Sequence, residues 1–251
     1  MKIFLAGADT FLGRPLLPEH IKDTYILESF YTLSKRTKEN LKYYKSFLLD
    51  SGAFSFFGGL KGRTVDWSDY VNRYAEFINN YNIGNFFELD IDVIVGYDEV
   101  KRIRSLLEKK TQKQVIPVWH KSRGIEEYKK MCEEYKYVAI GSSGQHDSVW
   151  TRKQPEILHK LVLYAKDKGV KVHGLGMTKF ELLRKIPFYS TDSTAWIAGN
   201  KFGYIYKFNG SGIDKITRTQ GQRLSDTYKT VLNNFLEWKK FQQYADIVLR
   251  G

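Results

Sequence analysis

The fold is decided by the stretch Ser46-Phe-Leu-Leu-Asp50, together with residues 66–80 and Asn85-Phe-Phe-Glu-Leu-Asp90 that follow it. The first and last of these segments are short apolar runs that end in an aspartate, and such runs are typical of buried strands. The segment between them has an amphipathic helical pattern and begins at Asp66, a residue type that caps helices well. Strand, helix and strand in this order predict a βαβ unit with two parallel strands.

The same pattern recurs along the rest of the chain. Further strands are predicted at residues 2–6, 24–28, 114–119, 137–140, 171–174 and 188–192, and further helices at 98–109, 125–135, 155–168 and 179–185. Residues 202–208 predict a hairpin strand, and residues 224–245 a closing helix. A chain of 251 residues has about the length that an eight-fold barrel needs. We therefore predict an α/β fold, a single (β/α)8 TIM-type barrel over residues 1–251, with a doubly wound open sheet as the alternative.

The charge balance favours a polyanionic partner. The chain has 40 Lys and Arg against 28 Asp and Glu, a formal net charge of +12, and the basic residues are spread widely. Each cation placed near a phosphate releases a condensed counterion, which gives affinity for nucleic acid. A solvated basic surface is the alternative interpretation. No apolar run approaches the length of a membrane span, so no membrane association is expected.

Cysteine content and known fingerprints limit the chemistry. Cys132 is the only cysteine, so an intrachain disulfide and a thiolate zinc site are excluded, and no metal is expected. The chain has no Walker or dinucleotide fingerprint, so no cofactor is expected. Residues 1–7 have the pattern of a first strand rather than a signal peptide, which predicts a cytoplasmic protein.

Carboxylates stand at the ends of several predicted strands. Asp50 ends the third strand, Asp90 ends the fourth with Asp92 just beyond it, and Asp192 ends the eighth. Since the carboxyl ends of barrel strands share one face, we expect these side chains to converge. Capping of the following helix or turn is the alternative for any one of them. Two carboxylates in one pocket can perform glycosyl transfer, one as the nucleophile and the other as the proton carrier.

Three motifs carry a family resemblance: Asp50-Ser51-Gly52-Ala53-Phe54, Asp92-Val-Ile-Val-Gly-Tyr-Asp98-Glu99, and His173-Gly174-Leu-Gly followed after a helix by Tyr189-Ser-Thr-Asp192. In their order and at predicted strand ends, they resemble motifs of the queuine and archaeosine tRNA-guanine transglycosylases. They resemble more closely the short relatives of that family, of the phage type, that modify DNA. Gly141-Ser142-Ser-Gly is similar to the family's base-contact loop. The resemblance covers about residues 46–196.

The resemblance implies roles for individual residues. Asp192 would be the nucleophile that forms a covalent intermediate with C1′, and Asp50 would be the general acid and base. Phe54 would stack on the base, and Asp98 would recognise its edge. Further substrate contacts are expected from Ser51, Asp90, Asp92, Trp119, His120, Gly141, Ser142, His173 and Gly174.

The departures from the family favour DNA over tRNA. The zinc-binding cysteines of the family are missing, so the zinc subdomain that helps to hold tRNA is missing too. A base-recognition glutamine of the family falls near Trp119 or His120, so the inserted base can differ. We expect an enzyme that replaces guanine in DNA with a free 7-deazaguanine base, such as 7-cyano-7-deazaguanine. A tRNA-acting enzyme and a non-catalytic nucleic-acid-binding barrel are the alternatives, and the oligomeric state stays open.

The net positive charge leads to a first prediction. We expect Lys and Arg to surround the mouth of the pocket that holds the strand-end carboxylates, and we expect DNA binding to weaken steeply with salt. The logarithm of the association constant should fall linearly with that of the salt concentration, by about 0.9 for each phosphate contacted. Fluorescence anisotropy of a labelled DNA at rising sodium chloride measures this slope. An affinity that did not change with salt would contradict the prediction.

Overall fold

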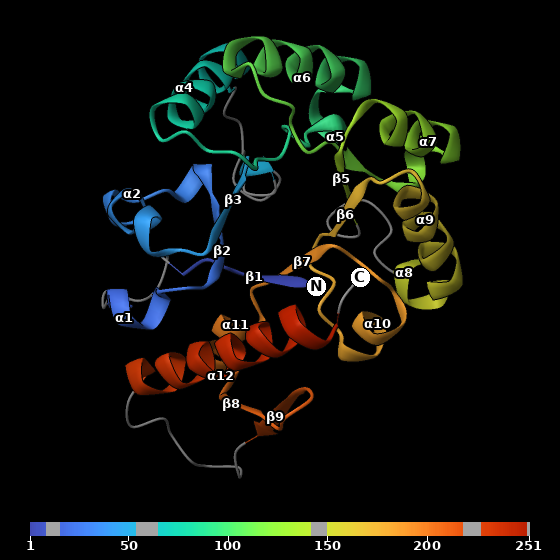
Figure 1. The fold of residues 1–251 in the computed structure, drawn as a ribbon. Helices are drawn as coiled ribbons and strands as arrows, with labels where there is room; N and C mark the ends of the chain where they lie inside the picture. Colours follow the sequence, from blue (N-terminus) through green and yellow to red (C-terminus); the bar gives the residue numbers. More distant parts are fainter. Residues whose placement is uncertain (9–15, 54–64, 142–149, 218–226, 250–251) are drawn as a thin grey trace.

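The computed structural model describes residues 1–8, 16–53, 65–141, 150–217 and 227–249. Within them, seven parallel strands form one curled sheet in the order β3-β2-β1-β7-β6-β5-β4 (Figure 1). The strands are β1 Lys2–Ala6, β2 Tyr25–Ser29, β3 Ser46–Asp50, β4 Val118–Trp119, β5 Tyr137–Ile140, β6 Lys171–Gly174 and β7 Ser190–Ser193. Because all of them run in one direction, their carboxyl ends lie together at one end of the sheet.

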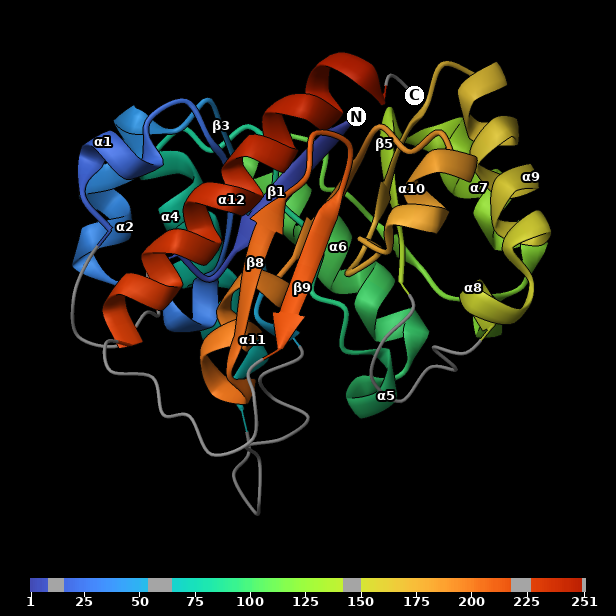
Figure 2. The same ribbon diagram turned by 90° about the horizontal axis from the view of Figure 1, so that it is seen from below.

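Helices surround this sheet on its outer side (Figure 1). They are α1 Pro18–Ile21, α2 Lys35–Asn40, α4 Trp67–Asn80, α5 Asp92–Val95, α6 Tyr97–Thr111, α7 Ile125–Glu134, α8 Trp150–Lys153, α9 Pro155–Asp167, α10 Phe180–Lys185, α11 Ala195–Phe202 and α12 Thr227–Val248. An antiparallel hairpin of β8 Tyr204–Phe208 and β9 Ile213–Thr217 packs beside α12 (Figure 2). Within the described ranges, no helix has the length and apolar composition needed to cross a bilayer.

The predicted α/β fold is confirmed, with seven of the eight predicted strands in one parallel sheet. The segment 85–90 is the exception, because it makes only isolated parallel bridges, from Phe86 to Leu49 and from Phe87 to Ile116. Beyond Glu88 the backbone turns, and the amide of Ile91 donates to the carbonyl of Leu89 at 3.0 Å. Among the described residues the sheet is therefore a curled half-barrel, and the prediction of a full strand at 85–90 was wrong in extent.

Some boundaries also differ from the sequence predictions. The strand predicted at 114–119 is paired over Val118–Trp119 only, and the hairpin strand begins at Tyr204 rather than at residue 202. The closing helix is confirmed and continues to Val248, beyond its predicted end. Such shifts are expected, because apolar patterns locate an element better than they locate its ends.

Alternate side chains of β1 enter two apolar environments. Ile3 and Leu5 are fully buried in the cluster between the sheet and its outer helices, which includes Phe235 of α12. Phe4 points to the other side and joins Phe87 in the cluster that the curled sheet encloses. Burial of both faces is the usual situation of parallel strands, and it explains why these runs are apolar throughout.

One polar side chain of α12 fastens the amino ends of β1 and β2. The side-chain amide of Gln242 donates to the carbonyls of Ile3 and Tyr25 at 2.7 and 2.9 Å. Its carbonyl oxygen accepts the amide hydrogen of Tyr25 at 3.1 Å. Gln242 is buried, and the two strands begin to pair only further along, at Leu5 with Ile26. Gln242 therefore satisfies backbone groups that the sheet leaves open at this end.

The second prediction follows from these bonds. Gln242→Leu should lower the free energy of unfolding by about 2–4 kcal/mol, because buried backbone groups lose their partner. Gln243→Leu is the matched control, since Gln243 is exposed on the same helix, and it should change stability by less than about 0.5 kcal/mol. Urea denaturation followed by circular dichroism measures both values. Equal effects of the two changes would contradict a structural role for Gln242.

Candidate active site

A cavity of about 440 Å³ opens at the carboxyl ends of the strands. Five carboxylate residues line it: Glu28, Asp50, Glu88, Asp90 and Asp192. They come from the ends of β2, β3 and β7 and from the segment 85–90. The expectation that Asp50 and Asp192 share one pocket is therefore met, and the strand direction is the reason.

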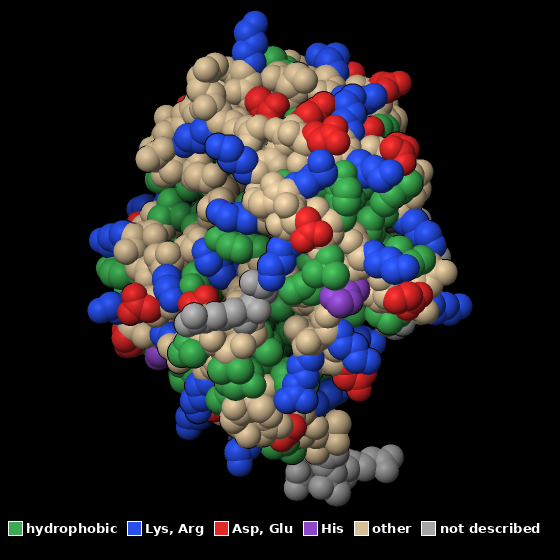
Figure 3. Space-filling view, turned by 45° about the vertical axis from the view of Figure 1, so that its right-hand side comes forward, with side chains coloured by type: hydrophobic (Ala, Val, Ile, Leu, Met, Phe, Trp, Pro, Cys, Tyr) green, Lys and Arg blue, Asp and Glu red, His purple; other side chains and the backbone are tan. Residues whose placement is uncertain are grey.

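The lining of this cavity is acidic. No Lys or Arg is among the described residues that line it, so the predicted basic rim does not appear in that part of the chain. Lys61 and Arg63 fall in the segment 54–64, outside the described residues. On the face shown in Figure 3, Lys and Arg side chains are dispersed rather than gathered in one patch.

Asp50 is held by the tight turn that follows β3. The amide of Gly52 donates to its carboxylate at 2.9 Å. Gly52 has a φ of +82°, and a Cβ there would lie 2.5 Å from the Cβ of Tyr31, so only glycine fits. Ser51 is buried beside it, and its carbonyl accepts the hydroxyl of Tyr70 at 2.6 Å. Phe54, the predicted stacking residue, lies outside the described residues.

The environment of Asp50 favours its protonated form. Burial raises its pKa most, the Gly52 amide lowers it, and the charges of Asp192 and Asp90 raise it further. The result is a pKa of about 6, against an ordinary value of 3.8. A carboxyl group with such a pKa exchanges a proton near neutral pH, as a general acid and base must.

Asp192 is oriented by two donors on one of its oxygens. His173 contacts Oδ1 through Nε2 at 3.1 Å, and the amide of Gly176 donates to the same oxygen at 2.8 Å. No hydrogen bond to Oδ2 is present among the residues that the structure describes. One oxygen of Asp192 is therefore anchored, and the other is available to a substrate.

A buried chain of polar groups lies behind Asp192. Nδ1 of His173 lies 2.6 Å from Oγ of Ser190, which in turn contacts the hydroxyl of Tyr137. The bonds are all satisfied if Tyr137 donates to Ser190, Ser190 to His173, and His173 through Nε2 to Asp192. His173 is fully buried and does not line the cavity. It was expected to contact substrate; in the structure its described contacts are with Ser190 and with Asp192, whose carboxylate it orients.

A second network fixes the segment that follows the fourth predicted strand. Arg123 donates from Nη2 to Asp90 and to Asp92, at 2.8 Å in each case. The other oxygen of Asp90 lies 2.7 Å from Nε2 of His120. Both oxygens of Asp90 are therefore occupied, which makes it a weaker candidate for a nucleophile than Asp192. His120 is buried behind it, and a Cβ on Gly141 would lie 2.2 Å from the His120 ring.

Several predicted contacts do not reach the cavity. Asp98 was expected at the edge of the base, but its side chain is 97% exposed on α6 and pairs with Lys101 at 2.7 Å. The hydrogen bond from Lys101 lowers the pKa of Asp98. Trp119 donates to the carbonyl of Gly124 and packs in the outer core. Gly174 packs against Phe188, and Ser142 lies outside the described residues.

Two of the cavity carboxylates, Glu28 and Glu88, and the cations that balance Glu88 were not predicted from the sequence. Glu88 accepts Nε of Arg104 at 2.5 Å and lies 3.4 Å from Nη1 of Arg123. Glu28, which ends the predicted strand 24–28, lines the cavity as well. Its position at a strand end was the signal that could have identified it. Within the described residues, no group of three His, Cys, Asp or Glu side chains is arranged to hold a metal ion.

The comparisons with known proteins add no family. No protein-family model matches the chain, and no curated protein matches it. The interpretation of this site therefore depends on the geometry of the cavity and on the motifs in the sequence.

The third prediction concerns the raised pKa of Asp50. Above about pH 6 the carboxylate is ionised in the folded and unfolded states, and ionisation is costly only in the folded one. Asp50→Asn should therefore stabilise the protein by about 3 kcal/mol at pH 7.5. This gain should shrink as the pH falls below about 6 and disappear below about pH 3, where both states bind the proton. Chemical denaturation at several pH values measures it.

Asp167→Asn serves as the control, because Asp167 is an exposed carboxylate at the end of α9. Its stability should stay within about 0.5 kcal/mol of the unmodified protein at both pH values. A destabilised Asp50→Asn variant at pH 7.5 would show that Asp50 is not held in a site that disfavours its charge.

Proposed function

We propose that this protein is a base-exchange glycosyltransferase that replaces guanine in DNA with a free 7-deazaguanine base, such as 7-cyano-7-deazaguanine. One observation carries the proposal. Asp50 and Asp192 line the same cavity but have different surroundings, one with a pKa raised to about 6 and the other with one oxygen anchored and one open. Carboxylates with separate environments are the usual basis of an acid and nucleophile pair.

In the first half of the reaction, an Asp192 oxygen attacks C1′ of the nucleotide while the bond from C1′ to the guanine nitrogen breaks. Protonated Asp50 gives its proton to the departing guanine, so the base leaves as a neutral molecule. His173 holds Asp192 in place through Oδ1, which leaves Oδ2 to form the ester. The result is a glycosyl ester on Asp192 and a carboxylate on Asp50.

In the second half, the incoming base attacks C1′ and the ester bond to Asp192 breaks. Asp50, now ionised, removes the proton from the attacking nitrogen of that base. This returns both carboxyl groups to their initial states, so the exchange needs no oxidant, reductant or nucleotide cofactor. The same two residues serve both directions, because arrival of one base is the reverse of departure of the other.

The acidic lining agrees with a site that admits a base and its sugar but not the phosphates. C1′ is inaccessible inside a duplex, so the nucleotide must leave the base stack. Phosphates that stay outside the cavity avoid its carboxylates and can contact the dispersed surface cations instead. Without the family's zinc-binding cysteines, DNA is the favoured substrate over tRNA.

We further propose that the curled sheet is the larger part of a (β/α)8 barrel. The two strands at its ends, β3 and β4, approach each other through the segment 85–90, which bridges to Leu49 on one side and to Ile116 on the other. Closure through this segment brings Asp50 and Asp90 to the same cavity.

The fourth prediction tests the covalent step. Asp192→Asn keeps the shape of the side chain but removes the attacking charge, so incubation with DNA should trap no protein-linked nucleic acid on a denaturing gel. Exchange of labelled guanine should fall by about a thousandfold or more. Asp50→Asn should slow the exchange, because the general acid is lost, but a covalent adduct should still form slowly. Asp214 is an exposed carboxylate outside the cavity, so the Asp214→Asn control should exchange guanine as fast as the unmodified protein.

The substrate is tested by mass spectrometry of nucleosides from DNA and tRNA of cells that express the protein. Deazaguanine nucleosides should occur in the DNA and be absent with the Asp192→Asn variant. Their occurrence in tRNA alone would identify a tRNA-acting enzyme instead. Undiminished guanine exchange by Asp192→Asn would show that the nucleophile is another residue.

A further inference from the structure

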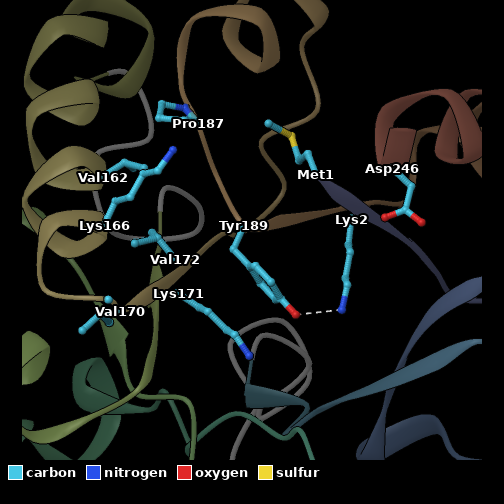
Figure 4. Close-up of a pocket in the computed structure, with 11 residues that line it drawn as sticks. Met1, Lys2, Val162, Lys166, Val170, Lys171, Val172, Pro187, Tyr189 and Asp246 are labelled. Atoms are coloured by element: carbon cyan, nitrogen blue, oxygen red, sulfur yellow. Dashed lines mark hydrogen bonds between the residues drawn. The ribbon is translucent and has the colours of Figure 1, made fainter. Parts of the chain in front are cut away.

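A second cavity, of about 530 Å³, is drawn in Figure 4, and its lining residues place it at the end of the strands opposite the carboxylate cavity. It is formed at the amino ends of β1, β6 and β7 and beside α9. Its lining consists of Met1, Lys2, Val162, Lys166, Gly169, Val170, Lys171, Val172, Pro187, Tyr189 and Asp246. None of these residues belongs to the proposed transfer site. The volume is within the range of small-molecule sites, which is roughly 300–1,000 Å³.

The cavity has an excess of positive charge. Lys2, Lys166 and Lys171 line it, and within the described part of the chain none of them pairs with a carboxylate. Asp246 is the one acidic residue of the lining, and its carboxylate accepts Nζ of Lys45 at 2.8 Å and the hydroxyl of Tyr25 at 2.6 Å. The charge of Asp246 is therefore balanced by Lys45, which is not one of the lysines that line the cavity.

Tyr189 holds two of the lysines in place. The ammonium group of Lys2 donates to its hydroxyl at 2.7 Å and lies 4.8 Å from its ring centroid. Nζ of Lys171 lies 4.8 Å from the same centroid, and Figure 4 shows the two chains approaching Tyr189 from different sides. Burial raises the pKa of Tyr189, but the bond from Lys2 and the charges of Lys2 and Lys171 outweigh it and lower the pKa overall.

The remaining wall is apolar. Val162, Val170, Val172 and Pro187 line the side of the cavity that faces α9 and the segment before β7, and the side chain of Lys166 ends near Pro187 (Figure 4). Several ammonium groups and one hydroxyl suit an anion with many acceptor oxygens, because lysine binds phosphate as a point charge. The valines suit a carbon skeleton or ring attached to that anion.

We propose that this amino-end cavity binds a small organic phosphate, with the phosphate between Lys2, Lys171 and Tyr189 and its carbon skeleton against Val170 and Pro187. Lys166 closes over the ligand from α9. The proposal does not depend on the transfer reaction, because no residue of the carboxylate cavity takes part in it.

The fifth prediction is tested by isothermal titration of the full-length protein with phenyl phosphate, inorganic phosphate and phenol at low ionic strength. Phenyl phosphate should bind saturably and more tightly than inorganic phosphate, and phenol should not bind measurably. Lys166→Gln and Lys171→Gln should each weaken phenyl phosphate about tenfold, as loss of one charge-assisted contact does. Both lysines are exposed, so neither change should prevent folding.

Three further variants make the test specific. Lys160→Gln removes an exposed lysine of the same helix as Lys166 and should leave affinity unchanged. Asp192→Asn should also bind phenyl phosphate normally, which separates this site from the transfer chemistry. Tyr189→Phe keeps the ring but loses the hydroxyl, and should weaken binding.

Equal affinity of inorganic and phenyl phosphate would overturn the organic part of the proposal. Absence of saturable binding, or unchanged affinity in Lys166→Gln and Lys171→Gln, would overturn the site itself. Binding of single-stranded DNA that is lost in these lysine variants, with no binding of phenyl phosphate, would show a nucleic-acid surface in place of a small-molecule cavity.

Discussion

The buried ion network of Glu88, Arg104 and Arg123 is the constraint on which the rest of the structure depends. Parallel strands bring several carboxylates to one end of the sheet, and an uncompensated buried carboxylate costs several kcal/mol. Glu88 is fully buried between the two guanidinium groups, and its other contact is the amide of Val118 at 2.8 Å. Burial raises the pKa of Glu88 while the charges of Arg104 and Arg123 lower it.

This network also explains why the segment 85–90 stops pairing as a strand. As far as Glu88, its backbone forms hydrogen bonds with Leu49 on one side and Ile116 on the other. The chain then turns, so that Asp90 and Asp92 reach Arg123. Arg123 spans three acidic side chains and in this way holds two loops together at the cavity. Among the described residues Asp50 has no such cation beside it, and burial together with the charges of Asp192 and Asp90 raises its pKa.

The two ends of the sheet carry side chains of opposite charge. Carboxylates gather at the carboxyl ends of the strands, whereas lysines surround the cavity at the amino ends. Between them runs the buried chain from Asp192 through His173 and Ser190 to Tyr137, whose ring lies 5.4 Å from that of Tyr189. The interior of the sheet is therefore not purely apolar, and the four polar groups of this chain are hydrogen-bonded to one another.

The sequence predicted most elements correctly because each has a strong local pattern. The runs that became β1, β3, β5 and β6 were predicted with their observed bounds, since apolar runs between helical patterns are distinctive. Residues 85–90 had the same apolar pattern and yet did not form a strand, because the turn there depends on Arg123, which is distant in sequence. Asp98 was misplaced for a similar reason, since its motif spacing does not reveal that α6 turns it to solvent.

The sequence by itself determined the direction of the strands, and with it the convergence of Asp50 and Asp192, because residues that end parallel strands share one face whatever the details of packing. The place of Asp90 depends on the turn beyond Glu88 and on Arg123. Only the tertiary structure decided which carboxylate is protonated and which has an oxygen free to react. Its protonation and its free oxygens depend on burial and on partners such as His173, Arg123 and the Gly52 turn. Those partners come from other strands and loops, and their distances are set by the folding of the whole chain rather than by any local pattern.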